Sequence, residues 1–135
     1  MYDDVVTIYN MIKDVGYRTV IKGVHLEPNT GVALEGTGMK ENDTMLLIIP
    51  VDAPNKKYVD WKTFKGLSEN ERSNYFTLKA GDKIVEGELD FEITNVSPNT
   101  LANLERNNVN CFTMSNYALK KMTGSKLNHF EVTGR

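Results

Sequence analysis

Residues 84–94 read Ile-Val-Glu-Gly-Glu-Leu-Asp-Phe-Glu-Ile-Thr, and apolar and polar side chains alternate along them almost without a break. Successive side chains of a β-strand point to opposite faces of a sheet, so the pattern predicts one half-buried strand. The face predicted to be buried carries Val85, Gly87, Leu89, Phe91 and Ile93, and the exposed face carries Glu86, Glu88, Asp90, Glu92 and Thr94. The stretch therefore predicts a β-rich fold with one acidic surface.

The rest of the chain reads as further short strands separated by turn signals. Strand candidates lie at 5–11, 17–26, 31–34, 75–78, 109–114 and 128–133, and the apolar run 44–51 predicts a central strand buried on both faces. Trp61, Phe64 and Leu67 recur at helical spacing, and Ser-Pro-Asn-Thr at 97–100 can begin a second helix. We therefore expect a mainly β single domain over residues 1–135. It should be a small β-barrel or sandwich of about seven or eight short strands with one or two short helices.

The composition limits the class of protein. The 135 residues carry a formal net charge of −2, which argues against a general nucleic-acid binder because such proteins are usually basic. Cys111 is the only cysteine, so we expect no internal disulfide, no zinc site built from several cysteines, and a buried thiol. No apolar run approaches the roughly 18 residues of a transmembrane helix, and the first residues lack a secretory apolar region. We therefore expect a cytosolic site of synthesis and no membrane partner.

Motifs for catalysis are absent from the sequence. Gly36-Thr37-Gly38 lacks the spacing and the lysine of a phosphate-binding loop, and no Gly-x-Ser-x-Gly segment occurs. His25 and His129 lie in separate predicted strands and are interpreted as structural residues. A row of carboxylates on an extended strand also differs from the tight loop that holds calcium. The sequence thus predicts a protein that is not an enzyme and that uses no cofactor or metal.

Two further segments are candidates for contacts with partners. Residues 35–43 are rich in glycine and polar residues, which predicts a mobile surface loop with Gly36, Gly38, Met39, Lys40 and Glu41 as its candidates. A second set combines lysines with aromatic residues and consists of Lys56, Lys57, Tyr58, Trp61 and Lys62. Such a set can stack on single-stranded nucleic acid, as in oligonucleotide-binding barrels. Nearby acidic residues offset its charge, so we favour a contact with the acidic face of another subunit.

In their order along the chain, several segments resemble small structural proteins that tailed phages and prophages encode near the head–tail junction. They are Thr-Ile-Tyr-Asn at 7–10, Arg-Thr-Val-Ile-Lys-Gly-Val at 18–24, Phe-Thr-Leu-Lys-Ala-Gly-Asp-Lys-Ile-Val-Glu-Gly at 76–87, Gly-Ser at 124–125 and His-Phe-Glu-Val-Thr-Gly at 129–134. In that family the Gly-Asp segment introduces a hairpin, and the His-aromatic-Glu-Val ending forms the last strand. The resemblance spans most of the chain, and residues 52–73 carry no match.

The resemblance implies a head-completion, head-closure or stopper protein of the virion neck, made in the cytoplasm of a bacterial host. Such proteins are looped β-barrels that form a homo-oligomeric ring below the portal and its adaptor and join the DNA-filled head to the tail. They catalyse nothing, and double-stranded DNA passes through them without specific binding. On this interpretation the acidic row Glu86, Glu88, Asp90 and Glu92 lines the channel or faces a neighbouring subunit, and the loop 35–43 is the movable segment. The alternatives are a tail terminator or another tail-proximal ring protein, and an oligonucleotide-binding-type barrel.

Overall fold

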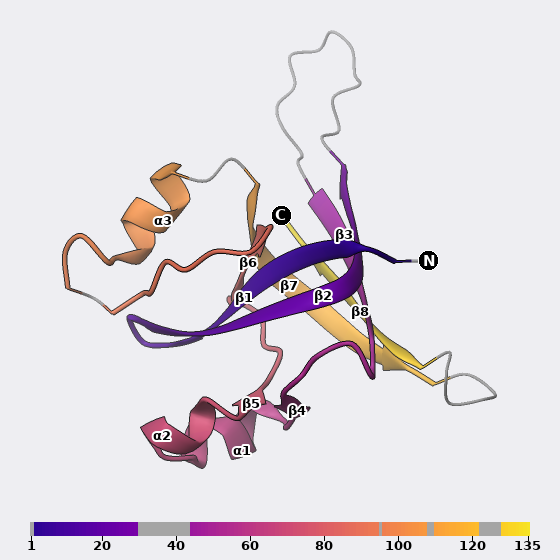
Figure 1. Ribbon diagram of the computed structural model, residues 1–135, viewed down its shortest axis with the longest axis horizontal. Coiled ribbons are helices and arrows are strands. Elements are labelled where there is room, and N and C mark those ends of the chain that lie inside the picture. The colour runs from indigo at the N-terminus through magenta and orange to yellow at the C-terminus, as the bar shows by residue number, and fades with distance from the viewer. Residues whose placement is uncertain (1, 30–43, 95, 108–109, 122–127) are drawn as a thin grey trace, which may run out of the picture.

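The computed structural model describes residues 2–29, 44–94, 96–107, 110–121 and 128–135 (Figure 1). Its strands are β1 (Asp4–Ile12), β2 (Val15–Asn29), β3 (Thr44–Pro50), β4 (Lys57–Tyr58), β5 (Tyr75–Phe76), β6 (Lys83–Glu86), β7 (Cys111–Lys120) and β8 (His129–Gly134). Its helices are α1 (Trp61–Gly66), α2 (Glu69–Arg72) and α3 (Leu101–Asn107). The prediction of a mainly β protein is confirmed, and the described residues contain one short helix more than expected.

Six of the strands close a barrel in the order β1-β2-β3-β8-β7-β6, and β6 returns to β1. All six pairings are antiparallel, whereas β4 and β5 form a separate parallel pair. Closure gives each of the six strands a partner on both sides over part of its length, which protects most of the sheet edge. Of the two architectures left open by the sequence, the strand pairing selects the barrel.

The barrel interior is filled by alternate apolar side chains of its strands. In β3 these are Met45, Leu47 and Ile49, all buried, whereas the intervening side chains Leu46 and Ile48 are partly exposed. The prediction that the 44–51 run is buried on both faces is therefore wrong for its outer face. Only the inner face of β3 contributes to the main hydrophobic cluster.

β1 is the strand that is buried on both faces. Val6 and Ile8 belong to the cluster inside the barrel, and Tyr9 and Met11 belong to a second cluster on its outer face. Leu104 of α3 packs into this outer cluster, as do apolar side chains from the stretch that follows β6. The residues that follow β6 therefore cover the outside of the barrel beside α3 (Figure 1).

The small parallel pair and two helices lie together on one side of the barrel (Figure 1). Asp60 caps α1 by accepting the Thr63 N–H, and α1 buries Phe64, whose ring meets Tyr17 of β2 edge-on at 5.8 Å between centroids. α2 begins with a capping box, in which Ser68 and Glu71 accept each other's backbone N–H. The helical spacing of Trp61, Phe64 and Leu67 thus identified α1, whereas the Ser-x-x-Glu signal of α2 was missed.

Candidate functional site

The acidic row lies in residues 86–94, called the acidic segment here, and this segment leaves the barrel where β6 ends. β6 ends at Glu86, and Gly87 follows with φ of +94°, a conformation that residues with a side chain rarely adopt. The prediction of one continuous strand over 84–94 is therefore wrong beyond Glu86. The alternation of side chains persists, because Leu89, Phe91 and Ile93 pack in the outer cluster while the acidic side chains are exposed.

Buried Thr7 of β1 fixes the start of the acidic segment. Its hydroxyl donates to the Gly87 carbonyl at 2.7 Å and accepts the Leu89 N–H at 3.0 Å. The Gly87 N–H in turn donates to the Val5 carbonyl at 2.8 Å. The Thr7 side chain thus takes the place of the backbone ladder that ends at Glu86. It gives hydrogen-bond partners to the Gly87 carbonyl and the Leu89 N–H, which would otherwise be buried without them.

Two longer side chains hold the middle of the acidic segment. Tyr9 of β1 donates its hydroxyl to the Phe91 carbonyl at 2.7 Å, and Arg18 of β2 donates Nη1 to the Leu89 carbonyl at 2.8 Å. Burial raises the pKa of Tyr9 to about 12; Arg18 opposes this shift, and the charges of Glu92 and others nearby add to it. The Tyr9 phenol therefore stays protonated and able to donate at neutral pH.

Two of the four carboxylates are paired with cations of β2. Glu92 accepts the Arg18 Nε at 3.1 Å, and Glu88 lies 3.8 Å from the Lys22 ammonium. The side chains of Glu88 and Lys22 are 60% and 71% exposed, so that ion pair contributes little to stability. Arg18, in contrast, joins β2 to the acidic segment through two contacts, one with the Glu92 carboxylate and one with the Leu89 carbonyl.

The other two carboxylates have no cation beside them among the described residues. Glu86 accepts the side-chain amide of Asn110. Asp90 has no ion pair or side-chain hydrogen bond within the described residues. The acidic segment therefore presents uncompensated negative charge to its surroundings.

Lys56, the first residue of the lysine–aromatic set, points into the protein. Its ammonium donates to the Arg18 carbonyl at 2.8 Å and to the Thr19 hydroxyl at 3.0 Å. Burial lowers its pKa, and the neighbouring Arg18 charge acts in the same direction. Lys56 thus attaches the segment before β4 to β2.

The other members of that set are also divided between the interior and the surface. Tyr58 is half-buried against the main cluster, and Trp61 lies beneath the Lys79 ammonium at 4.7 Å from the ring centroid. Lys57 and Lys62 are exposed. The five residues therefore do not form one surface, and a subunit contact there stays a prediction for Lys57 and Lys62 alone.

The remaining predicted candidates lie elsewhere. Gly36, Gly38, Met39, Lys40 and Glu41 fall outside the described residues. The two histidines stand on the barrel wall, each beside a glutamate two residues further on: His25 at 2.8 Å from Glu27, and His129 at 3.1 Å from Glu131. These contacts are consistent with the structural interpretation of both histidines.

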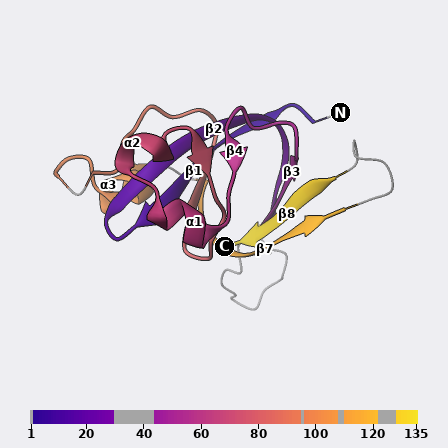
Figure 2. The same cartoon turned by 90° about the horizontal axis from the view of Figure 1, so that it is seen from below.

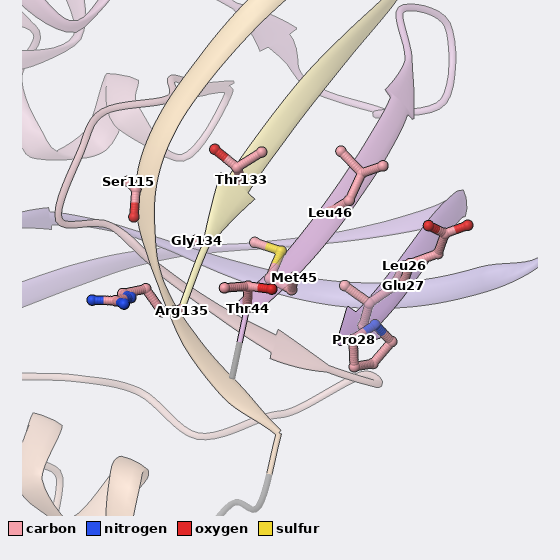
Figure 3. Close-up of a pocket in the computed structure, with 10 residues that line it drawn as sticks. All are labelled: Leu26, Glu27, Pro28, Thr44, Met45, Leu46, Ser115, Thr133, Gly134 and Arg135. Atoms are coloured by element: carbon pink, nitrogen blue, oxygen red, sulfur yellow. The ribbon is translucent and has the colours of Figure 1, made fainter. Parts of the chain in front are cut away.

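A groove of about 930 Å³ lies where β2 ends and β3 begins (Figure 3). It is lined by the ends of β2, β3 and β8 and by Ser115 at the irregularity in β7. Figure 3 shows its charged residues, Glu27 and Arg135, on opposite sides. The described residues that line the groove therefore bring no reactive groups together.

Asp82 forms a buried polar network that sequence reasoning missed. Its carboxylate accepts the Met11 N–H at 3.0 Å and the Asn10 side-chain amide at 2.9 Å, and it lies 3.2 Å from the Lys79 ammonium. Burial raises the pKa of Asp82, and these donors oppose the shift. The Gly-Asp turn was predicted, but two partners of Asp82, Asn10 and Met11, lie 72 and 71 residues earlier in the chain, where no local signal can indicate them.

Reactive groups are scattered over the described residues. No group of three or more histidine, cysteine or acidic side chains there is arranged to hold a metal ion. Cys111 is partly buried beneath α3, and burial raises its pKa to about 11, which disfavours the thiolate. No helix among the described residues is long and apolar enough to cross a membrane.

Comparison with known proteins gives one match. The model of DUF6751, a family of unknown function, matches residues 1–135. No curated protein and no solved structure matches the chain.

Proposed function

We propose that this chain, which belongs to the DUF6751 family of unknown function, is a non-enzymatic structural protein of the tailed-phage virion neck. On this proposal copies of the chain form a ring that joins the DNA-filled head, through the portal and adaptor, to the tail. The proposal starts from the resemblance of segments such as 18–24 and 76–87 to head–tail junction proteins, and the closed barrel agrees with it.

The observation that carries the proposal is the acidic segment and the way it is held. Thr7, Tyr9 and Arg18 fix its backbone on the barrel, while the carboxylates of Glu86 and Asp90 have no cation beside them in the described part of the chain. Lysine or arginine along a DNA channel would release counterions on contact with phosphate and retain the DNA. Carboxylates on a rigid support repel phosphate instead, which suits a surface along which DNA must slide.

The same features reduce the support for the alternatives. An oligonucleotide-binding module needs exposed aromatic rings among cations, whereas Tyr58 packs against the core and Trp61 is covered by Lys79. A tail terminator would be expected to have more helix beside its sheet, and the three described helices have 4 to 7 residues each.

The test combines assembly with DNA binding. The full chain is mixed with a candidate portal protein, chosen from the genes that neighbour its own, and the particles are imaged by electron microscopy. The proposal predicts a ring of this chain on the portal and no salt-sensitive binding of labelled single- or double-stranded DNA in fluorescence anisotropy. Tight, salt-sensitive binding of single-stranded DNA would favour the oligonucleotide-binding module, and portal particles without an added ring would contradict the neck assignment.

A further inference from the structure

We propose that an open strand edge and an extended segment of opposite charge join copies of this chain head to tail. The far half of β7, residues 116–120, in one copy pairs with the acidic segment of the next copy. The inference rests on the proposed ring and names the contact between its neighbouring subunits.

The far half of β7 has a strand on one side only. β7 pairs with β8 from Asn116 to Lys120, whereas its pairing with β6 ends at Thr113. The turn before β6 covers β7 as far as Met114, through backbone bonds of Gly81 and Asp82. Beyond that point no strand of the described chain lies on this second side.

The bonds at the end of β8 show which backbone groups of β7 point outward. Thr113 and Arg135 exchange both backbone hydrogen bonds at 3.0 Å. In an antiparallel pair such bonds recur at every second residue, so the backbone groups of residues 133, 131 and 129 of β8 also face β7. They pair with residues 116, 118 and 120, and the backbone groups of Tyr117 and Leu119 therefore point away from β8. The Tyr117 N–H donates to the Asn116 side-chain oxygen at 2.9 Å and not to β8, as this orientation requires. The Tyr117 carbonyl and the backbone N–H and C=O of Leu119 have no hydrogen-bond partner within the described residues.

The acidic segment is the second open edge. The Leu89 and Phe91 carbonyls are bound by side chains of the barrel, and the Ile93 carbonyl is bound by the backbone of β2. The backbone groups of Glu88 and Asp90, which alternate with them, make no hydrogen bond within the described residues. In an extended chain bonded on one side at alternate residues, the intervening N–H and C=O groups face the other side. Glu88 and Asp90 therefore present donors and acceptors to an incoming strand.

The spacing of the two edges is compatible. Each presents outward groups two residues apart, Tyr117 with Leu119 on one and Glu88 with Asp90 on the other, as a β ladder requires. Pairing would also cover Leu119, whose side chain is 42% exposed.

The charges and positions of the two edges favour a head-to-tail contact. Exposed Lys120 and Lys121 flank the β7 edge, and carboxylates line the other edge, so opposite charges meet. Pairing of β7 with β7 across a two-fold axis would offer these lysines no carboxylate from the partner's edge, because residues 116–121 contain no acidic residue. The two edges lie toward opposite ends of the long axis, β7 on the right and the acidic segment on the left (Figures 1 and 2). A contact between different edges propagates from copy to copy, and it forms a ring when the rotation between neighbouring copies closes on itself.

Two proline variants test the contact, because proline removes an N–H and blocks an edge. Leu119→Pro and Asp90→Pro each remove an N–H that points outward, so the bonds within the subunit are kept. Leu119→Ala and Asp90→Ala are the matched controls that keep the N–H. The mass of the full chain is measured by sedimentation velocity, with circular dichroism as the check of folding.

We expect wild type and both alanine variants to associate, and each proline variant alone to be monomeric. A mixture of the two proline variants should give a 1:1 dimer and nothing larger, since each supplies the edge that the other lacks. Self-association of Asp90→Pro alone would show that β7 pairs with itself and overturn the inference, as would assembly of both proline variants like wild type. In that second case the ring function stands and only this contact is wrong.

Charge variants decide the question if a proline variant does not fold. Lys120→Glu combined with Lys121→Glu should raise the dissociation constant by at least about tenfold and weaken its dependence on salt. An unchanged constant would contradict the contact. A wild-type chain that never associates, alone or with the portal, would contradict both the contact and the proposed ring.

Discussion

The Tyr9 hydroxyl and the Phe91 carbonyl, 82 residues apart in sequence, meet in a 2.7 Å hydrogen bond that holds the acidic segment on the barrel. Tyr9 is fully buried, and its ring packs in the outer cluster with Ile93 and Leu104. The bond therefore links a core residue of β1 to a segment that has no strand ladder of its own. Removing this bond is therefore the most direct test of how firmly the acidic segment is held.

Tyr9→Phe keeps the ring and removes this bond. We expect the free energy of unfolding to fall by about 1 kcal/mol, since the Phe91 carbonyl loses its donor. Amide hydrogen exchange should accelerate over residues 87–94 more than in β3. The matched control is Tyr17→Phe, whose hydroxyl accepts a hydrogen bond from the Arg72 Nη1 at 2.9 Å and makes none to the acidic segment among the described residues. Equal exchange in both variants would contradict the anchoring role of Tyr9.

The raised pKa of Tyr9 predicts that the folded protein loses stability at alkaline pH. The pKa of Tyr9 in the folded protein is about 12, above the ordinary value of 10, so the folded state retains this proton more strongly than the unfolded state. Its contribution is fully present below pH 10 and is lost as the pH rises through about 12. Urea unfolding at a series of pH values should show the difference between wild type and Tyr9→Phe shrinking over that range. A constant difference would contradict the assignment.

Asp82→Ala should be among the most damaging single substitutions. It leaves the Met11 N–H, the Asn10 amide and the Lys79 ammonium without their buried acceptor, at a cost of about 3 kcal/mol or more. Asp60→Ala is the control, because it removes only an exposed helix cap and should lower the free energy of unfolding less. Thermal or urea unfolding gives both values, and equal costs would contradict the role of the buried network.

The thiol of Cys111 should react slowly. Its pKa of about 11 and its partial burial beneath α3 leave little thiolate at pH 8. Reaction with a disulfide reagent at that pH should be much slower in the native protein than in urea, where the thiol is exposed. Equal rates in the two conditions would show that α3 does not protect Cys111.

Local patterns predicted much of the barrel. The strand candidates at 5–11 and 17–26 identified β1 and β2, and Ser-Pro-Asn-Thr at 97–100 marked the start of α3. The strand at 109–114 was recognised but is longer, since β7 runs to Lys120. Its exposed far half has weak alternation, and it is a strand because β8 pairs with it.

The acidic segment shows the limit of such patterns. The alternation from Val85 to Ile93 correctly separated buried from exposed side chains, but it could not show that Gly87 ends the ladder. The anchors Thr7, Tyr9 and Arg18 lie more than 70 residues away, and their roles arise from the folded barrel. The same holds for Lys56, whose charge suggested a surface contact but which binds the backbone of β2.

Mass measurement of the full chain, alone and with its portal, tests the central claim most directly. A closed ring predicts one assembly whose mass is a fixed multiple of 15.2 kDa and does not grow further with concentration. A chain that stays monomeric under both conditions, or that turns over a substrate as a monomer, would contradict the account.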